Sequence, residues 1–153
     1  MSKTFDNLVQ DIWHINKALP AAGLVTATSG NASGVDRASG RIVIKPSGVA
    51  YDVLTPDDLA IVDLATGAHL AGKKPSVDTI HHLLLYQRDP TLGGVIHTHS
   101  NYATAFAAVG RAIPCCLTAI ADEFGAEIPC LPYVDNVDDH IADDWQTGQR
   151  TDG

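Results

Sequence analysis

The spacing of apolar residues predicts the first element of the chain. Between positions 4 and 19, apolar side chains recur near 3.6-residue spacing with polar side chains between them. Pro20 and Gly23 follow this segment and predict its end. The pattern predicts an amphipathic helix over 4–19, whose apolar face consists of Phe5, Leu8, Val9, Ile12, Trp13, Ile15 and Leu19.

Shorter apolar runs along the rest of the chain predict strands that alternate with helices. Strands are expected at 24–28, 41–45, 59–64, 94–98, 113–117 and 128–131. Helices are expected at 79–88, 102–109 and, from a weaker pattern, 135–144, with a helical turn opened by Thr55 and Pro56. The alternation favours an α/β layered domain. A chain of 153 residues forms one core, so we expect a single domain over 1–153.

The composition is that of a globular protein and argues against some classes of binding partner. Hydrophobic residues make up 45% and charged residues 18%, with a net charge of −8. The acidic balance argues against nucleic acid or an anionic membrane surface as a partner. No apolar run approaches the roughly 18 residues needed to span a bilayer. The N-terminus lacks the basic and then apolar layout of a signal peptide, so we expect a cytoplasmic protein.

Cysteine usage agrees with a reducing compartment. The three cysteines are Cys115, Cys116 and Cys130, an odd number with an adjacent pair and no CxxC motif. This pattern predicts buried free thiols, with zinc ligation as the alternative.

The segment from Gly93 to His99 carries the most informative chemistry. Gly93–Ile96 is typical of a buried strand, and His97 and His99 follow it two positions apart. On a strand, both imidazoles would project from one face, roughly 7 Å apart along the chain, with Thr98 on the other face. Two neutral imidazoles so placed can reach one ion at about 2.0–2.1 Å each. Two unrelated histidines are the simpler alternative, and the neighbouring motifs favour a metal site.

Asp78 has two compatible interpretations. It precedes a predicted helix and can act as its N-cap, and its carboxylate can also lie near the metal as a ligand or as a partner of a ligand. His81 and His82 follow on the same helix and are expected to be structural or partly exposed.

Three short polar turns offer donors for an anion. They span 29–33, 45–48 and 73–76, and each provides backbone N–H groups and hydroxyls. Each alone can be an ordinary turn, whereas together they indicate a phosphate pocket. None matches a P-loop or a GxGxxG fingerprint, so nucleotide binding is not supported. Further along, Asp122 follows an apolar stretch and can be a general acid/base or a solvated loop residue, and Glu123 is expected to be solvated.

Four ordered runs resemble one family. They are GNAS at 30–33, IKPSGVAYDVLTPDDLAIVDLATG at 44–67, KKPSVDTIHHLLLYQ at 73–87 and GGVIHTHSNYATAFA at 93–107. Over about residues 5–140 the chain resembles the class II aldolase and adducin family, and most of all its L-ribulose-5-phosphate 4-epimerase branch. The resemblance implies a three-layer α/β/α fold around a mostly antiparallel sheet, and homo-tetrameric full-length relatives with active sites between subunits.

The resemblance also implies roles for particular residues. A divalent metal, most often Zn²⁺, would be held by His97, His99 and Asp78. The acid/base would be Asp122, with Thr118 near it. The substrate phosphate would be bound by Gly30, Asn31, Ser47, Gly48 and Ser76, assisted by Lys45.

The implied activity is that of a metal-dependent phosphosugar epimerase. The metal would act as a Lewis acid while the bond between carbons 3 and 4 breaks and re-forms, which inverts carbon 4. One alternative is a class II sugar-phosphate aldolase similar to fuculose-phosphate aldolase. Asp78 argues against it, because the aldolases place a glutamate there, and so does Asp122. Another alternative is a non-catalytic adducin-like or remnant domain.

The chain departs from the family pattern at three places. Val77 stands where the family has a second phosphate-binding serine, and 128–136 is more similar to the aldolase branch. Family members continue further, to a third metal-binding histidine and a C-terminal tyrosine acid/base, whereas residues 144–153 contain no histidine. We therefore expect a domain that lacks the usual C-terminal part and turns over little substrate by itself, with His140 as an alternative third ligand.

Overall fold

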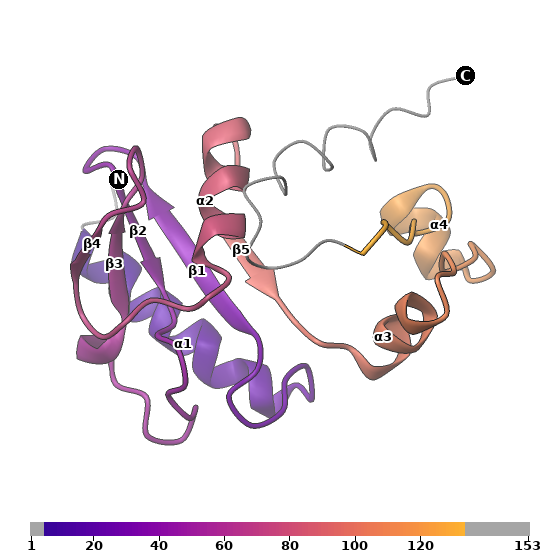
Figure 1. Cartoon of the computed structure of the whole chain (residues 1–153), viewed down its shortest axis with the longest axis horizontal. Helices are drawn as coiled ribbons and strands as arrows, with labels where there is room; N and C mark the ends of the chain where they lie inside the picture. The colour runs from indigo at the N-terminus through magenta and orange to yellow at the C-terminus, as the bar shows by residue number, and fades with distance from the viewer. Residues whose placement is uncertain (1–4, 134–153) are drawn as a thin grey trace. The chain divides into compact units, whose positions relative to one another are not determined.

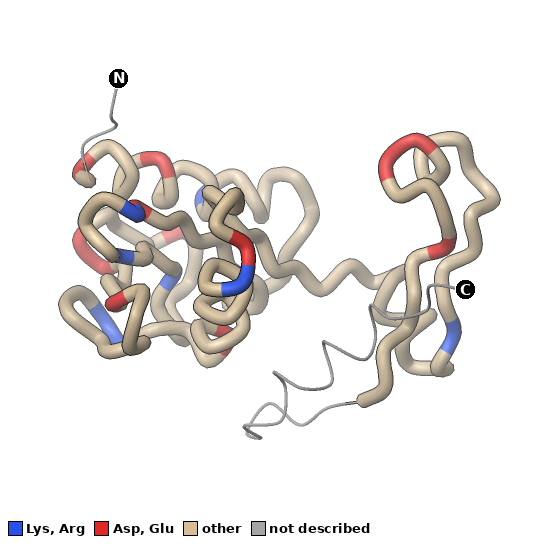
Figure 2. Tube along the Cα trace, turned by 90° about the horizontal axis from the view of Figure 1, so that it is seen from above, with Lys and Arg blue, Asp and Glu red and all other residues tan. Residues whose placement is uncertain are grey.

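The computed structural model describes residues 5–133. The chain divides into two compact units, Met1–His99 and Ser100–Gly153 (Figure 1). The single domain expected over 1–153 stays a prediction. Within the described residues, no helix is long and apolar enough to cross a membrane. Basic and acidic residues are interspersed along the trace of the first unit (Figure 2).

The first unit is built on one antiparallel sheet. Its strands lie in the order β4-β3-β2-β1-β5, and every neighbouring pair is antiparallel. The last strand in sequence therefore pairs with the first, which brings residues of β5 beside those of β1. The strands are β1 Asn31–Asp36, β2 Arg41–Ile44, β3 Ala60–Asp63, β4 His69–Ala71 and β5 Gly94–His97.

Two helices cover opposite faces of this sheet. They are α1, Phe5–Ala21, and α2, Thr79–Arg88 (Figure 1). Successive side chains of a strand point to opposite faces, and β2 shows this: Ile42 and Ile44 cluster with Tyr86 of α2, whereas Val43 clusters with Ile12 of α1. The helix–sheet–helix arrangement confirms the predicted three-layer α/β/α class.

Most predicted elements of the first unit are present. The helix expected over 4–19 is α1, which continues through Pro20 to Ala21. The expected helical turn is the 3₁₀ helix η1, Pro56–Asp58, in which the Asp58 carboxylate accepts a hydrogen bond from the Thr55 amide. The strands expected at 41–45, 59–64 and 94–98 are β2, β3 and β5, each shortened by one or two residues.

The segment between α1 and β1 corrects two predictions. Residues 24–28 form no strand, and the turn expected over 29–33 ends early, because β1 already begins at Asn31. The tight turn lies upstream, where the Ser29 amide donates to the Thr26 carbonyl. Asn31 and Ser33 are polar, turn-favouring residues, yet pairing with β5 gives their backbone groups ladder partners that outweigh local propensity. The short, exposed strand β4 had no hydrophobic pattern that could predict it.

The second unit contains two helices within its described part, α3 Asn101–Ala108 and α4 Thr118–Phe124. The sequence predicted α3 but not α4, although Gly125 ends α4 in the left-handed conformation that favours glycine. The strands expected at 113–117 and 128–131 are wrong in extent: in the described residues they form a single bridge, Ile113 to Ile128. The helix expected at 135–144 lies outside the described residues.

The cysteines are free, as predicted, but they are not buried. Cys115 and Cys116 are exposed and Cys130 is partly exposed. The prediction of buried thiols is wrong because, among the described residues, this part of the second unit forms only the bridge at Ile113 and no packed sheet layer over the thiols that follow it.

Candidate metal and phosphate site

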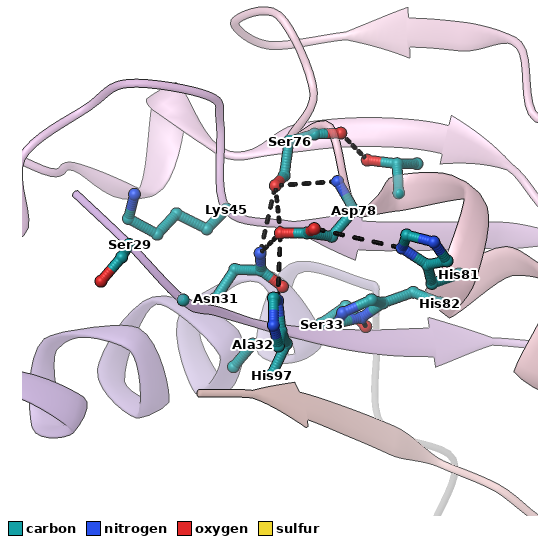
Figure 3. Close-up of polar contacts among 12 residues, drawn as sticks. Ser29, Asn31, Ala32, Ser33, Lys45, Ser76, Asp78, His81, His82 and His97 are labelled. Carbon is teal, nitrogen blue, oxygen red and sulfur yellow. Dashed lines mark hydrogen bonds and ion pairs between the residues drawn. The ribbon is translucent and has the colours of Figure 1, made fainter. Parts of the chain in front are cut away.

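The carboxylate of Asp78 is the centre of the candidate site (Figure 3). Asp78 occupies the N-cap position of α2, as predicted, but its side chain makes no capping hydrogen bond. Its Oδ2 instead accepts hydrogen bonds from Asn31 Nδ2 at 2.7 Å and from Ser76 Oγ at 3.2 Å. The same Oδ2 lies 3.1 Å from His97 Nδ1. The Asp78 carboxylate therefore contacts the side chains of Asn31, Ser76 and His97 rather than the helix backbone.

Strand register explains why these residues meet. Asn31 of β1 is directly opposite His97 of β5, and opposite residues of an antiparallel pair project from the same face. Val95, two residues before His97, packs on the α2 side of the sheet, so His97 faces α2 as well. Asn31 and His97 therefore both point toward the N-terminus of α2, where Asp78 lies.

Asp78 and His97 shift each other's pKa. The His97 imidazole holds the pKa of Asp78 well below its usual range, although burial opposes the shift. In turn, the Asp78 carboxylate raises the pKa of His97 above its ordinary 6.5. A carboxylate beside Nδ1 favours the proton on that nitrogen, which leaves the lone pair of neutral His97 on Nε2.

His99 lies beside His97. Strand β5 ends at His97, so His99 belongs to the segment that follows, yet the two ring centroids are only 4.7 Å apart with the planes tilted by 45°. Among residues 5–133, no three or more His, Cys, Asp or Glu side chains are grouped in a way that could hold a metal ion. The structure brings together a pair of imidazoles with Asp78 against one of them, so Asp78 as a direct ligand stays a prediction.

The three predicted anion-binding turns are neighbours in space. The Ser47 amide donates to the Lys74 carbonyl at 2.9 Å, and Pro46 forms a bridge to Pro75. Asn31 Nδ2 also donates to Ser76 Oγ at 3.1 Å, which links the first turn to the third. Ser47 and Gly48 are exposed residues, although the Ser47 amide itself is already bonded to Lys74.

The backbone conformation at position 30, just before β1, requires glycine. Its φ is +72°, in the left-handed region, and an added Cβ would lie 2.5 Å from Val25 Cγ1 and 2.9 Å from the His97 carbonyl. Any larger residue would push the start of β1 away from β5, and with it Asn31 from His97.

Lys45 is buried beneath these turns with 1% of its surface exposed. Its Nζ donates to the Thr28 carbonyl at 3.3 Å and lies 4.6 Å from the centre of the Tyr51 ring. Burial lowers the pKa of Lys45 from its ordinary 10.5. Tyr51 Oη donates to the carbonyls of Ser29 and Gly30. The two side chains thus hold the segment that leads into β1, while the predicted contact of Lys45 with phosphate stays a prediction.

The sequence did not predict a buried polar chain next to the site. Ser33 Oγ lies 2.6 Å from His82 Nδ1 and 2.7 Å from Tyr86 Oη, and all three side chains are almost completely buried. His82 was expected to be structural or partly exposed, and it is buried. His81, also on α2, places its Nδ1 4.0 Å from Asp78 Oδ1. The spacing of His82 and Tyr86, four residues apart beside the apolar Leu83, was the pattern that could have indicated this chain.

The buried His82 should make the stability of the protein depend on pH. Burial lowers the pKa of His82 to about 4 from an ordinary 6.5. Between these values the unfolded chain binds the extra proton, so the free energy of unfolding should fall as the pH drops from 6.5. We expect urea denaturation at pH 6.5 and pH 5.0 to differ by about 2 kcal/mol more in the parent than in His82→Asn, which keeps a polar atom near Ser33 but does not titrate. Equal pH dependence in both proteins would contradict this assignment.

Thr118 and Asp122, the predicted acid/base pair, both lie on α4 in the second unit and both are exposed. They are four residues apart on one helix, so their side chains occupy the same side of it. Their role toward the residues of the first unit stays a prediction. Glu123 is exposed, as expected.

Comparison with known proteins identifies the family. Residues 10–151 match the family described as Class II Aldolase and Adducin N-terminal domain, and the chain belongs to this family. It is 52% identical over 123 residues to an L-ribulose-5-phosphate 4-epimerase, UlaF, from Salmonella paratyphi C. That match covers 80% of this chain and 54% of the relative, so the chain spans about half the length of the curated relatives it matches.

Solved structures agree with this assignment. The fold is similar to that of an L-fuculose 1-phosphate aldolase, with a TM-score of 0.82 and 26% identity over 92% of this chain and 66% of the aldolase. It is also similar to an L-fuculose-1-phosphate aldolase from Thermus thermophilus, with a TM-score of 0.63 and 29% identity over 80% of this chain and 61% of that protein. The class II aldolase fold expected from the sequence is therefore confirmed.

Proposed function

We propose that this chain provides the metal- and phosphate-binding part of a sugar-phosphate 4-epimerase that acts on L-ribulose 5-phosphate. The observation that carries the proposal is the contact of Asp78 with both His97 and Asn31. One carboxylate thereby connects the imidazole pair to the turns that offer donors to an anion. The 52% identity to an L-ribulose-5-phosphate 4-epimerase supports this substrate in particular.

The donor set fits a divalent ion such as Zn²⁺. His97 Nδ1 lies 3.1 Å from Asp78 Oδ2, so a proton on Nδ1 would leave Nε2 as the ligating nitrogen, and the His99 ring is 4.7 Å away. Two imidazoles that share one ion at about 2.0–2.1 Å have ring centres about 5 Å apart, so the pair needs little rearrangement. Asp78 would act chiefly by orienting His97. When bound, the ion would supply Lewis acidity to the oxygens of the ketose.

Other residues of the chain would bind the phosphate and transfer the proton. Ser47, Gly48 and Ser76, with Gly30 and Asn31 from the first turn, would hold the phosphate through neutral N–H and O–H donors. A bound phosphate fixes the sugar so that the bond between carbons 3 and 4 can break and re-form after the aldehyde fragment rotates. Asp122 would move the proton at the carbon 4 hydroxyl, and Thr118 would assist in positioning it.

A chimera tests the proposal directly. The C-terminal part of the Salmonella relative is joined to this chain, and conversion of L-ribulose 5-phosphate to its carbon 4 epimer is followed by NMR. We expect turnover that is lost in His97→Ala and kept in His69→Ala, a matched change at an exposed histidine of β4. A folded chimera without turnover, or turnover that survives His97→Ala, would refute the proposal and favour a non-catalytic adducin-like domain.

An aldolase activity is the second candidate, because solved L-fuculose 1-phosphate aldolases share the fold at TM-scores of 0.82 and 0.63. The same chimera separates the two activities. An aldolase would release a ketone fragment and an aldehyde from L-fuculose 1-phosphate, whereas the epimerase returns a five-carbon product. Release of fragments as the dominant reaction would replace the epimerase proposal with an aldolase.

Val77 provides a prediction about phosphate affinity. Its side chain is 68% exposed beside Ser76, at the position where the family resemblance places a second serine. We expect Val77→Ser to tighten binding of L-ribulose 5-phosphate to the chimera by about 0.5–1.5 kcal/mol, since it adds one hydroxyl donor. Calorimetric titration measures the change, and Val53→Ser at another exposed valine is the control. Unchanged affinity in Val77→Ser would show that this side chain does not face the phosphate.

A further inference from the structure

The start of β1 extends beyond its partner strand. The Val35 amide donates to the Gly93 carbonyl, so odd-numbered residues of β1 direct their backbone groups toward β5 and even-numbered ones toward β2. The register between β1 and β2 begins only at Ser33 and Ile44. Ala32 is thus an even-numbered residue whose backbone groups face β2 at a point where that strand has ended.

The side chain of Asn16 takes the place of the missing strand. Its Oδ1 accepts from the Ala32 amide at 2.9 Å, and its Nδ2 donates to the Ala32 carbonyl at 3.0 Å. Nδ2 also donates to the Ile12 carbonyl at 2.8 Å, which fixes the amide against α1. Asn16 is completely buried, so no water competes for these contacts. A single carboxamide therefore reproduces both hydrogen bonds of a strand partner.

We propose that Asn16 is a positioning residue for the candidate site, acting through Ala32 on Asn31; as a statement about function, this rests on the proposed sugar-phosphate site. Asn31 is the residue directly before Ala32, and its Nδ2 reaches both Asp78 and Ser76. The next residue, Ser33, is tied from the α2 side by His82 and Tyr86. Asn16 is the tie on the α1 side, and without it the peptide that carries Asn31 can rotate.

NMR of the 153-residue chain tests this step without any ligand. The side-chain amide protons of Asn31 should lie downfield in the parent protein, because Nδ2 donates to a carboxylate. We expect Asn16→Leu, which has the same side-chain branching but no polar atoms, to move both proton shifts toward those of a solvent-exposed asparagine. The Ala32 amide should at the same time exchange with solvent at least tenfold faster.

Lys17→Met is the matched control. Lys17 is the adjacent residue of α1, and its Nζ donates to the Tyr51 and Asp52 carbonyls. Lys17→Met should lower stability while leaving the Asn31 signals in place. Unchanged Asn31 signals in Asn16→Leu, or an equal displacement in Lys17→Met, would overturn the proposal. If Asn16→Leu does not fold, Asn16→Asp replaces it, because aspartate keeps the acceptor for the Ala32 amide and removes the donor. The chemical shifts of the Asn31 side-chain amide protons then test the proposal in the same way.

The chimera adds a functional readout. We expect Asn16→Leu to weaken L-ribulose 5-phosphate binding about tenfold, the loss of one well-formed hydrogen bond, and Lys17→Met to leave it unchanged. If the parent chimera binds no phosphosugar, the proposed function fails, whereas the positioning of Asn31 is still decided by the NMR shifts. Normal affinity in an Asn16→Leu chimera whose Asn31 shifts have moved would overturn the functional part of the inference.

Discussion

Asp78→Asn should weaken zinc binding to the chain by about 10–100-fold. The carboxylate lies 3.1 Å from His97 Nδ1 and raises the basicity of that imidazole, and loss of such a partner typically has an effect of this size. Asparagine has a similar shape and can still accept a hydrogen bond from Asn31, so the change removes mainly the charge. Calorimetric titration with Zn²⁺ at about pH 7.5, where the metal competes with protons for the imidazole nitrogens, measures the difference.

Asp57→Asn is the control for this experiment. Asp57 is an exposed carboxylate of η1, and its substitution alters the net charge by the same amount. Zinc affinity should be unchanged in Asp57→Asn. An Asp78→Asn protein that binds zinc as tightly as the parent, or an equal loss in both variants, would show that the carboxylate does not support a metal-binding imidazole.

Tyr86→Ala should lower the free energy of unfolding by about 3–5 kcal/mol, the usual range for deleting a large buried aromatic side chain. Tyr86 is completely buried and packs with Ile42 and Ile44 of β2 and Leu83 of α2. Tyr86→Phe keeps this packing but removes the hydroxyl 2.7 Å from Ser33 Oγ, so it should lose about 1–3 kcal/mol. Urea denaturation of the parent and both variants measures the two contributions.

Tyr102→Phe provides the comparison for the hydroxyl. Tyr102 is 85% exposed on α3, so loss of its hydroxyl should alter stability by less than about 0.5 kcal/mol. A Tyr86→Phe protein as stable as the parent would show that the Ser33 hydroxyl is satisfied by His82 alone. A Tyr86→Ala loss below about 2 kcal/mol would show that the α2 face of the sheet repacks around the cavity.

Local pattern was sufficient for the amphipathic helix and for the short apolar strands. Helix α1 has apolar positions at helical spacing, β2 and β3 are short runs of apolar residues, and the structure places all three where the sequence predicts. The same reasoning failed at β1. Its residues Asn31, Ser33 and Gly34 favour turns, and only pairing on two sides makes them a strand. Helix α4 escaped prediction because seven residues are too few for a helical period to be distinguished from a loop.

For the candidate site, the sequence by itself predicted the chemistry and determined the family. The His-x-His motif, Asp78 and the three donor-bearing turns were evident from residue types and spacing, and the ordered resemblance identified the class II aldolase and adducin family. Only the tertiary structure decided how these residues are arranged. The β1–β5 register places Asn31 opposite His97, so the Asp78 carboxylate turns from its own helix toward them. Asn16 and His82 were recognised only there, because hydrogen bonds between residues far apart in sequence leave no periodic pattern along the chain.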